Sequence, residues 1–350
     1  MSLPHRVLFL TFSFLAITAL SLGNFCSAEE TKTLRIGIIG LDTSHSSNFS
    51  KILNDPHTEF EEFKTCKVVA AYPKGSKDIK ESLDSVPKIT EQVTQLGVEI
   101  VPSIEALLSK VDAVLLESND GRVHLEQALP VLKAGKPLFV DKPIAGNLVD
   151  VIAIYEAAKH FKTPVFSSSS LRYTDGAKKI VGGSIGDIIG CDAYSPSPKE
   201  STHPDFYWYG IHGVETLYTI MGPGCETVVR VSTPNTDVAI GTWKQGRIGT
   251  FRGRRKDNNT YQGGYGGSAF GTKGTAQIGS FSGYEPLLVE VVKFFRTGKA
   301  PVSNAESVEI YTFMTAADLS KAKAGAPVKM QAVYSRALKA ARKKLAPYLD

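Results

Sequence analysis

Short apolar runs alternate with amphipathic segments along the first half of the chain. The apolar runs are typical of parallel strands, which are covered on both faces and therefore lose the alternation with polar residues. The segments between them repeat apolar residues at helical spacing. We expect strands at residues 34–39, 66–72, 98–101, 111–116, 137–140 and 164–166, and helices at residues 46–53, 103–108, 122–134 and 148–160. This order predicts a doubly wound parallel sheet.

The second half changes character after about residue 166. Residues 239–243 and 247–251 have strand character and flank Lys244-Gln245-Gly246, which is a hairpin signal. Further elements are expected as a strand at residues 275–278 and helices at residues 286–297, 308–324 and 333–345. The chain is therefore predicted to be an α/β protein with a Rossmann-type domain at residues 33–165. An α+β domain with a large, mostly antiparallel sheet should follow at residues 166–350.

The first 28 residues are expected to be a signal peptide rather than part of the fold. Arg6 precedes an apolar stretch, residues 7–22, and small residues up to Ala28 precede an acidic pair. The apolar stretch is shorter than the roughly 20 residues that span a bilayer. We expect cleavage near Ala28, with a lipid-anchored Cys26 as the alternative. The mature chain should be periplasmic or extracellular, with no stable membrane span.

Composition narrows the choice of partners. The formal net charge of +5 is too mild for a nucleic-acid partner. The cysteines are too sparse for a disulfide framework, and their spacing fits no zinc site. We expect no metal site; His212 with Glu215 or His203 is the alternative.

The turn after the first strand keeps one glycine, Gly40, where a dinucleotide-binding turn has three. Asp42 stands where the backbone should come closest to the diphosphate. One interpretation is a modified turn, in which Thr43, Ser44 and the helix amides bind an anion or a sugar. The other is that these side chains only cap the helix. His45 either faces the cleft or packs at the helix start.

The second strand is not followed by the acid that holds the ribose of a dinucleotide. Lys74 and Ser76 follow instead. They either hold the 2′-phosphate of NADP or form a plain surface turn.

Several segments, in order, resemble the Gfo/Idh/MocA family, which includes glucose–fructose oxidoreductase and inositol dehydrogenase. They are residues 36–40, 111–114 with Ser118, Asn119 and His124, 135–143, 171–173, 183–187, 210–212, 298–301 and 325–328. The resemblance implies a Rossmann domain, NAD or NADP as cofactor, and hydride transfer at a sugar or polyol carbon. It also implies a homodimer or homotetramer formed through the open face of the second sheet.

The resemblance assigns roles to residues that follow the fourth and fifth strands. Ser118, Asn119, His124 and Asp141 would contact the cofactor. Lys142 would lie beside the nicotinamide and the reacting hydroxyl, where a cation stabilises a developing alkoxide or relays its proton. The alternative is that Lys142 is a surface lysine. Its bond to the following proline is a candidate cis peptide.

His212 is the candidate base, because imidazole titrates in the useful range. The family usually has an aspartate four residues earlier, where this chain has Trp208. Glu215 is therefore expected to orient His212, with a purely structural histidine as the alternative. Arg172, Tyr173, His203 and Tyr209 are candidate substrate contacts, because aromatic faces with polar tips suit sugar rings.

Two functions follow. The first is an NAD(P)-dependent oxidoreductase that acts on a sugar, polyol or sugar derivative. The alternative is an exported carbohydrate-binding or non-redox protein that keeps the fold and has lost dinucleotide binding. The general secretory route threads chains unfolded, which disfavours a cofactor loaded before export.

Overall fold

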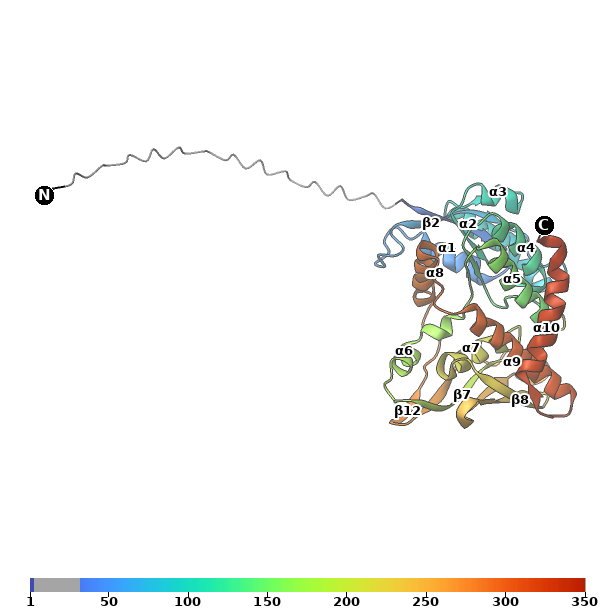
Figure 1. The fold of residues 1–350 in the computed structure, drawn as a ribbon. Helices are drawn as coiled ribbons and strands as arrows, with labels where there is room; N and C mark the ends of the chain where they lie inside the picture. Colours follow the sequence, from blue (N-terminus) through green and yellow to red (C-terminus); the bar gives the residue numbers. More distant parts are fainter. Residues whose placement is uncertain (3–31, 350) are drawn as a thin grey trace. The chain divides into compact units, whose positions relative to one another are not determined.

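The first half of the chain folds into a six-stranded parallel sheet with helices on both faces, as the computed structural model in Figure 1 shows. The structure describes residues 1–2 and 32–349. The expected cleavage at Ala28 and the lipidated Cys26 lie outside the described residues. Within residues 32–349, we find no helix with both the length and the apolar character needed to cross a bilayer.

The order of the six strands brings three carboxyl ends together. The order is β3-β2-β1-β4-β5-β6, so the sequence reverses direction between β1 and β4. The strands are β1 (Leu34–Ile39), β2 (Cys66–Tyr72), β3 (Glu99–Ile100), β4 (Ala113–Leu116), β5 (Leu138–Val140) and β6 (Val165–Phe166). Open α/β sheets bind ligands at such a reversal, outside the carboxyl ends of the strands. The loops after β1, β4 and β5 are therefore the place to look for a site.

Both faces of this sheet are buried, as the apolar runs predict. In β4, Ala113 and Leu115 point into one core cluster and Val114 and Leu116 into the other. The first cluster includes α1 (Ser44–Leu53), α2 (Lys80–Gln95) and α8 (Glu285–Thr297). The second includes α3 (Ile104–Leu108), α4 (His124–Lys133) and α5 (Leu148–Phe161). The predicted doubly wound sheet is confirmed.

In the first domain, the helix α2 is the element that the apolar pattern missed. Its sequence is mostly polar, and Pro87 interrupts it. Only Ser82, Ile89 and Val93 are buried, and the last two lie four residues apart on one face. Two buried apolar positions in 16 residues are too few to reveal a helix by periodicity.

The second half forms a seven-stranded sheet in the order β12-β11-β7-β10-β9-β8-β13. Its strands are β7 (Ile188–Pro196), β8 (Cys225–Ser232), β9 (Thr236–Trp243), β10 (Ile248–Arg254), β11 (Gly266–Gly271), β12 (Gly274–Gln277) and β13 (Val328–Lys329). Only β7 and β10 pair in parallel, so the predicted, mostly antiparallel sheet is confirmed. Residues 244–246 join β9 to β10 as the expected hairpin.

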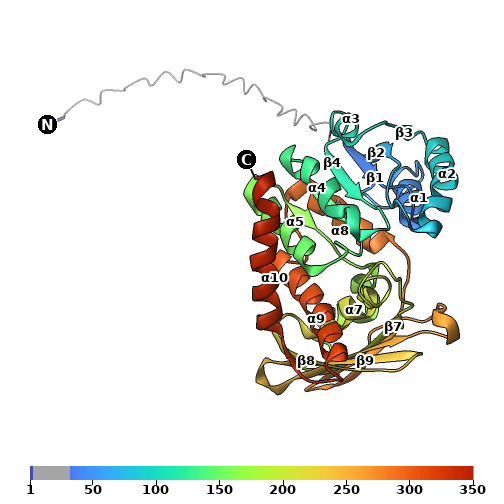
Figure 2. The same cartoon turned by 90° about the vertical axis from the view of Figure 1, so that its right-hand side faces the viewer.

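One face of the second sheet is covered and the other is open. Figure 2 shows α7 (Gly210–Met221) and α9 (Asn304–Ala322) on the covered face. On alternate positions, Ile189, Val231 and Ile248 are more than half exposed. The open face thus presents apolar side chains to solvent within the described chain.

The C-terminal part of the chain returns to the first sheet. Phe294 of α8 packs against Phe166 of β6, with 5.5 Å between the ring centres. The last helix, α10 (Met330–Leu345), packs along α5. Its Arg342 donates to Glu156 of α5 at 2.9 Å. Part of the basic face predicted for this helix is therefore paired.

Gly40 occupies a position that excludes a larger side chain. Its φ is +90°, and an added Cβ would lie 2.4 Å from the amide nitrogen and the hydroxyl oxygen of Ser118. We expect Gly40→Ala to lower the free energy of unfolding by roughly 3 kcal/mol, because strain and a backbone clash combine. Urea denaturation measures this.

Gly97→Ala is the matched control for this prediction. Gly97 also has a left-handed φ, +80°, but an added Cβ would meet nothing within 4 Å. We expect a loss of about 1 kcal/mol from backbone strain alone. Equal losses in the two variants would contradict the claim that the loop after β4 needs the space over Gly40.

Candidate functional site

A polar cleft of about 690 Å³ lies beyond the carboxyl ends of β1, β4 and β5. Residues from the start of α1 and from α2 form one side. Residues of α7 and of the loops around β11 and α8 form the other. Lys142, which follows β5, lies between them. The cleft thus occupies the position that an open α/β sheet favours for ligands.

Lys142 brings a positive charge into the cleft. It precedes Pro143 through the expected cis peptide bond. Its Nζ lies 5.7 Å from the centre of the Tyr209 ring, within reach of a cation–π interaction. This placement favours a role at a ligand over the surface-lysine alternative.

His212 lies across the same cleft but is held differently from expectation. Its Nδ1 is 2.8 Å from the hydroxyl oxygen of Ser169. Burial lowers the pKa of His212 to about 3, with further contributions from Lys142 and His45. The imidazole is therefore neutral over the whole neutral range. It can exchange a hydrogen bond with a ligand, but it does not titrate near pH 7 as expected from its type.

Glu215 does not orient His212. Its carboxylate accepts from Arg172 Nε at 3.2 Å and from Arg172 Nη2 at 3.1 Å. Arg172 also pairs with Glu306 at 2.7 Å. A buried charge needs such partners, so these residues form a structural ion-pair group. Neither Arg172 nor Tyr173 lines the cleft, and the substrate role expected for them has no support in their placement.

Aromatic side chains form much of the cleft wall on the second-domain side. Tyr209 and Tyr261 have ring centres 5.4 Å apart, and the hydroxyls of Tyr261 and Tyr265 are 3.5 Å apart. Tyr265 meets His212 edge-on at 5.7 Å. Tyr284 meets His45 edge-on at 4.9 Å. Of this group, Tyr209, His45 and His212 were singled out from the sequence. The other tyrosines lie in glycine-rich loops without a motif.

Asp42 bridges three loops instead of capping its own helix. Its side chain accepts from the Ser76 amide at 3.1 Å and from the Asn119 amide at 3.0 Å. Burial raises the pKa of Asp42, although these two amides act in the opposite direction. The carboxylate also fills the space over Gly75, where an added Cβ would lie 2.2 Å from it. The helix cap is Thr43, whose Oγ1 accepts from the His45 amide.

The backbone amides of Gly40 and Leu41 are also occupied. Gly40 donates to the Tyr72 carbonyl at 2.8 Å, and Leu41 donates to the Pro73 carbonyl at 3.1 Å. These bonds extend the pairing of β1 and β2 past the strand ends. The space over Gly40 is filled by Ser118 of the β4 loop.

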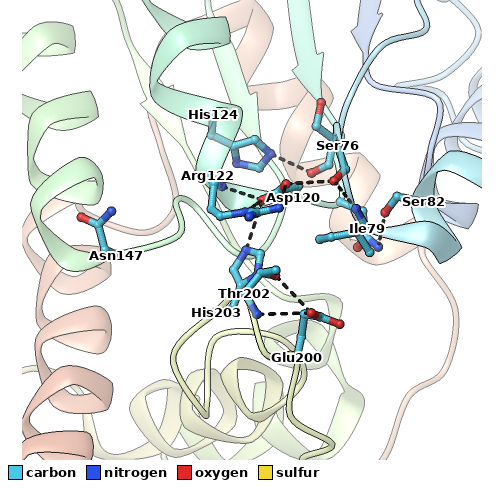
Figure 3. A network of polar contacts seen from close by, with 12 residues as sticks. Ser76, Ile79, Ser82, Asp120, Arg122, His124, Asn147, Glu200, Thr202 and His203 are labelled. Atoms are coloured by element: carbon cyan, nitrogen blue, oxygen red, sulfur yellow. Dashed lines mark hydrogen bonds and ion pairs between the residues drawn. The ribbon is translucent and has the colours of Figure 1, made fainter.

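A second network of hydrogen bonds and ion pairs, drawn in Figure 3, also joins these loops, away from the cleft. Asp120 accepts from the Ser76 hydroxyl at 2.9 Å and from Arg122 Nε at 2.9 Å. Its carboxylate is also 3.5 Å from Nε2 of His203, in a loop of the second domain. Arg122 in addition pairs with Asp78. His203 is thus tied to the loop after β4 and does not line the cleft.

The remaining cofactor candidates make internal contacts. The Ser118 hydroxyl donates to Gln127 at 2.7 Å. His124 is fully buried, with its ring nitrogens near the Ile144 and Ser118 carbonyls. The Lys74 carbonyl accepts from Gln127 at 3.1 Å. Of the expected cofactor contacts, Thr43, Ser44, His45, Asn119 and Lys142 reach the cleft, and so does part of Asp42.

These contacts test whether a dinucleotide fits the turn. A Rossmann turn offers free amides and an open approach to the diphosphate. Here the amides of Gly40 and Leu41 are bonded to the end of β2 and the following loop, and a carboxylate takes the amides of Ser76 and Asn119. An anionic diphosphate would meet bonded amides and a buried acid. The part of the turn from Gly40 to Asp42 therefore does not fit the diphosphate of a dinucleotide in the usual position.

Asp141 and Glu117 lie beneath the cleft. Burial by itself raises the pKa of Asp141, but His45 at 2.7 Å and Lys142 lower it to about 2. Glu117 directly follows β4 and is completely buried. Burial, followed by the nearby Asp141, raises the pKa of Glu117 well above its ordinary value. Sequence reasoning missed Glu117, because an acid after an apolar strand normally signals only the strand's end.

A larger hollow, of about 1170 Å³, lies between α5, α9 and β8. It shares no lining residue with the strand-end cleft. Its acid Glu309 already accepts from the amides of Gly224 and Cys225. The strand-end cleft is thus the better candidate for chemistry.

The fold and the cleft define a class: a Rossmann domain joined to an α+β domain, with polar residues gathered at the strand ends. Residues 34–168 match the model of the Gfo/Idh/MocA family, which is described as an oxidoreductase family with an NAD-binding Rossmann fold. The match to this family thus covers the first domain, which is less than half of the chain. An uncharacterized oxidoreductase of Streptococcus pneumoniae is 25% identical over 163 residues, which cover 41% of this chain and 43% of that protein. The match thus spans less than half of that relative.

Solved structures share the fold at low sequence identity. A probable dehydrogenase from Thermotoga maritima superposes with a TM-score of 0.68 at 22% identity, covering 86% of this chain and 100% of that one. A scyllo-inositol dehydrogenase from Lactobacillus casei, solved with NAD(H) and scyllo-inositol, gives 0.66 at 17%, covering 86% and 100%. A myo-inositol 2-dehydrogenase from Lactobacillus plantarum gives 0.67 at 18%, covering 85% and 99%. The two-domain architecture is thus that of known dehydrogenases.

The bridging contacts of Asp42 can be tested by measuring the stability of a variant that lacks them. We expect Asp42→Ala to lower the free energy of unfolding by about 2–3 kcal/mol, because the amides of Ser76 and Asn119 lose their acceptor. Denaturant titration measures the loss.

Asp55→Ala is the control, since Asp55 accepts from the His57 amide in an exposed turn. That change should cost no more than about 0.5 kcal/mol. Similar values for the two variants would show that Asp42 is solvated and does not bridge the loops.

Proposed function

We propose that the protein binds and processes a sugar, polyol or sugar derivative in the strand-end cleft. One observation carries this proposal: Lys142, His212 and a wall of tyrosines converge on a single polar cleft. Aromatic faces stack on the apolar faces of sugar rings, and the polar tips meet the hydroxyls. The inositol dehydrogenases that share the fold act on ligands of the same polyhydroxy class.

The roles of the two polar groups follow from their charges. Lys142 supplies a positive charge that stabilises negative charge on a ligand oxygen. His212 is neutral and fixed by Ser169, so it positions a hydroxyl by a hydrogen bond. The tyrosines restrict water on the opposite side. These roles require no dinucleotide at the β1 turn, consistent with the contacts of Asp42.

NAD(P)-dependent oxidation of a CH–OH group is the second candidate. It is supported by the family model, whose description names NAD, and by Lys142 at the end of β5. The contacts at Gly40 and Asp42 disfavour it. The choice between the two candidates is therefore a choice about dinucleotide binding.

Calorimetric titration separates the two candidates. We expect inositols or simple sugars to bind the protein without residues 1–28, and NAD and NADP not to bind. Saturable binding of either dinucleotide would instead select the oxidoreductase. Failure of both the dinucleotides and a panel of polyols and sugars to bind would contradict both candidates.

Lys142→Ala checks the role of the cation in the same titration. We expect at least tenfold weaker binding, which is the size of one hydrogen bond to a charged group. Lys88→Ala is the matched control, because Lys88 lines the rim of the same cleft and is exposed. An equal effect of the two substitutions would show that Lys142 acts only by adding positive charge to the cleft and makes no specific contact with the ligand.

We also propose export and self-association. Export rests on the signal-like residues 1–28.

Self-association rests on the exposed apolar side chains of the open sheet face, Ile189, Val231 and Ile248. We expect a dimer or tetramer in light scattering, and a monomer for Ile248→Lys. A monomeric protein without residues 1–28 would contradict this proposal.

A further inference from the structure

Glu117 is a buried acid without a partner. It is completely inaccessible to solvent, and neither carboxylate oxygen has a hydrogen-bond partner among the described residues. Burying an unpaired carboxylate is among the most costly arrangements in a protein. Its backbone is fixed, since the Glu117 amide donates to the Ile39 carbonyl at 2.7 Å. The side chain is therefore held in this position and needs a compensating group.

Two further ligating groups face Glu117. An imidazole nitrogen of His45, an oxygen of Asp141 and an oxygen of Glu117 all lie within 4.8 Å of one another. The three residues come from the start of α1, the end of β4 and the end of β5. Three adjacent, well-ordered elements thus aim one nitrogen and two carboxylates at a common point.

The charges around this point do not balance. Asp42 and Asp141 both lie close enough to Glu117 to act on it, and the cation that acts on both Glu117 and Asp141 is Lys142. Lys142 is also engaged with the Tyr209 ring. A second positive charge among these acids would remove the imbalance.

We propose that His45, Glu117 and Asp141 bind a divalent transition-metal ion such as Zn²⁺ or Mn²⁺. One imidazole and two carboxylates are a donor set that suits these ions. Ligand atoms around such an ion lie roughly 3–3.5 Å apart. The 2.7 Å contact of His45 with Asp141 therefore opens slightly when the ion enters. This replaces the expectation from sequence that the chain has no metal site.

The ion would be reached from the cleft. His45 lines the cleft and its side chain is 14% exposed, whereas Glu117 and Asp141 are closed off beneath it. Three protein ligands leave at least one coordination position free, as in catalytic metal sites. That position would face a ligand oxygen beside Lys142. The metal site stands on its own residues and does not depend on the identity of the cleft ligand.

Calorimetry with ZnCl₂ and MnCl₂, on protein stripped with a chelator, tests the site. We expect one ion per chain, and at least hundredfold weaker binding in Glu117→Gln and in Asp141→Asn, since even indirect partners of metal ligands alter affinity by 10- to 100-fold. Glu81→Gln is the control for loose cation binding, because Glu81 lines the same cleft outside the cluster. Its affinity should stay within about twofold of the original.

Thermal unfolding is a second measurement. It remains informative even if the substitution itself changes the stability of the fold. Glu117→Gln removes a buried acid, so the metal-free variant should unfold at a higher temperature than the metal-free original. Added metal should raise the unfolding temperature of the original chain and leave that of Glu117→Gln unchanged. Absence of stoichiometric binding, or equal binding by Glu117→Gln, would overturn the proposal. Polyol titration of metal-free protein remains a separate measurement, so its failure and failure of the metal site are distinguishable.

Discussion

The Asp42 carboxylate holds together the loops that follow β1, β2 and β4, and the shape of the strand-end region depends on this tie. In an open α/β sheet, these loops normally part around a ligand. Here they are bonded to each other, through Asp42 to Ser76 and Asn119 and through Asp120 to Ser76. The groove that would cross the sheet edge is thereby interrupted. The cleft beside Lys142, which faces the second domain, remains open.

Acids dominate the floor of this cleft. Asp141 is stabilised as a carboxylate by His45, while Glu117 receives no such help and its pKa rises. Proteins retain costly groups of this kind where they serve a ligand rather than the fold. By contrast, the acids around Arg172 are paired within the protein. The acids with a structural role, around Arg172, are therefore paired within the protein, whereas Glu117 has no hydrogen-bond partner among the described residues.

Apolar periodicity was sufficient to predict the first sheet, because strands buried on both faces leave long apolar runs. In the second sheet, which has one open face, it predicted β9, β10 and β12 but not β7, β8, β11 or β13. It failed at α2, where Pro87 and a polar composition hide the helix. The site was less predictable, since its contacts join distant positions. Asp42 meets Ser76 and Asn119, which are 34 and 77 residues away in the sequence. Likewise, the identity of Glu215 suggested a partner for His212, but only the fold reveals that Arg172 is closer.

The return of α8 to the first sheet constrains how the molecule is assembled. Leu287, Leu288 and Phe294 of this helix belong to the same core cluster as β1 and α1. A fragment that ended at residue 168, where the family match ends, would leave uncovered the part of that face on which α8 packs. During synthesis, the Rossmann half therefore exposes this apolar surface, which favours aggregation, until residue 297 emerges. The two halves are distinct in architecture but form a single unit of folding.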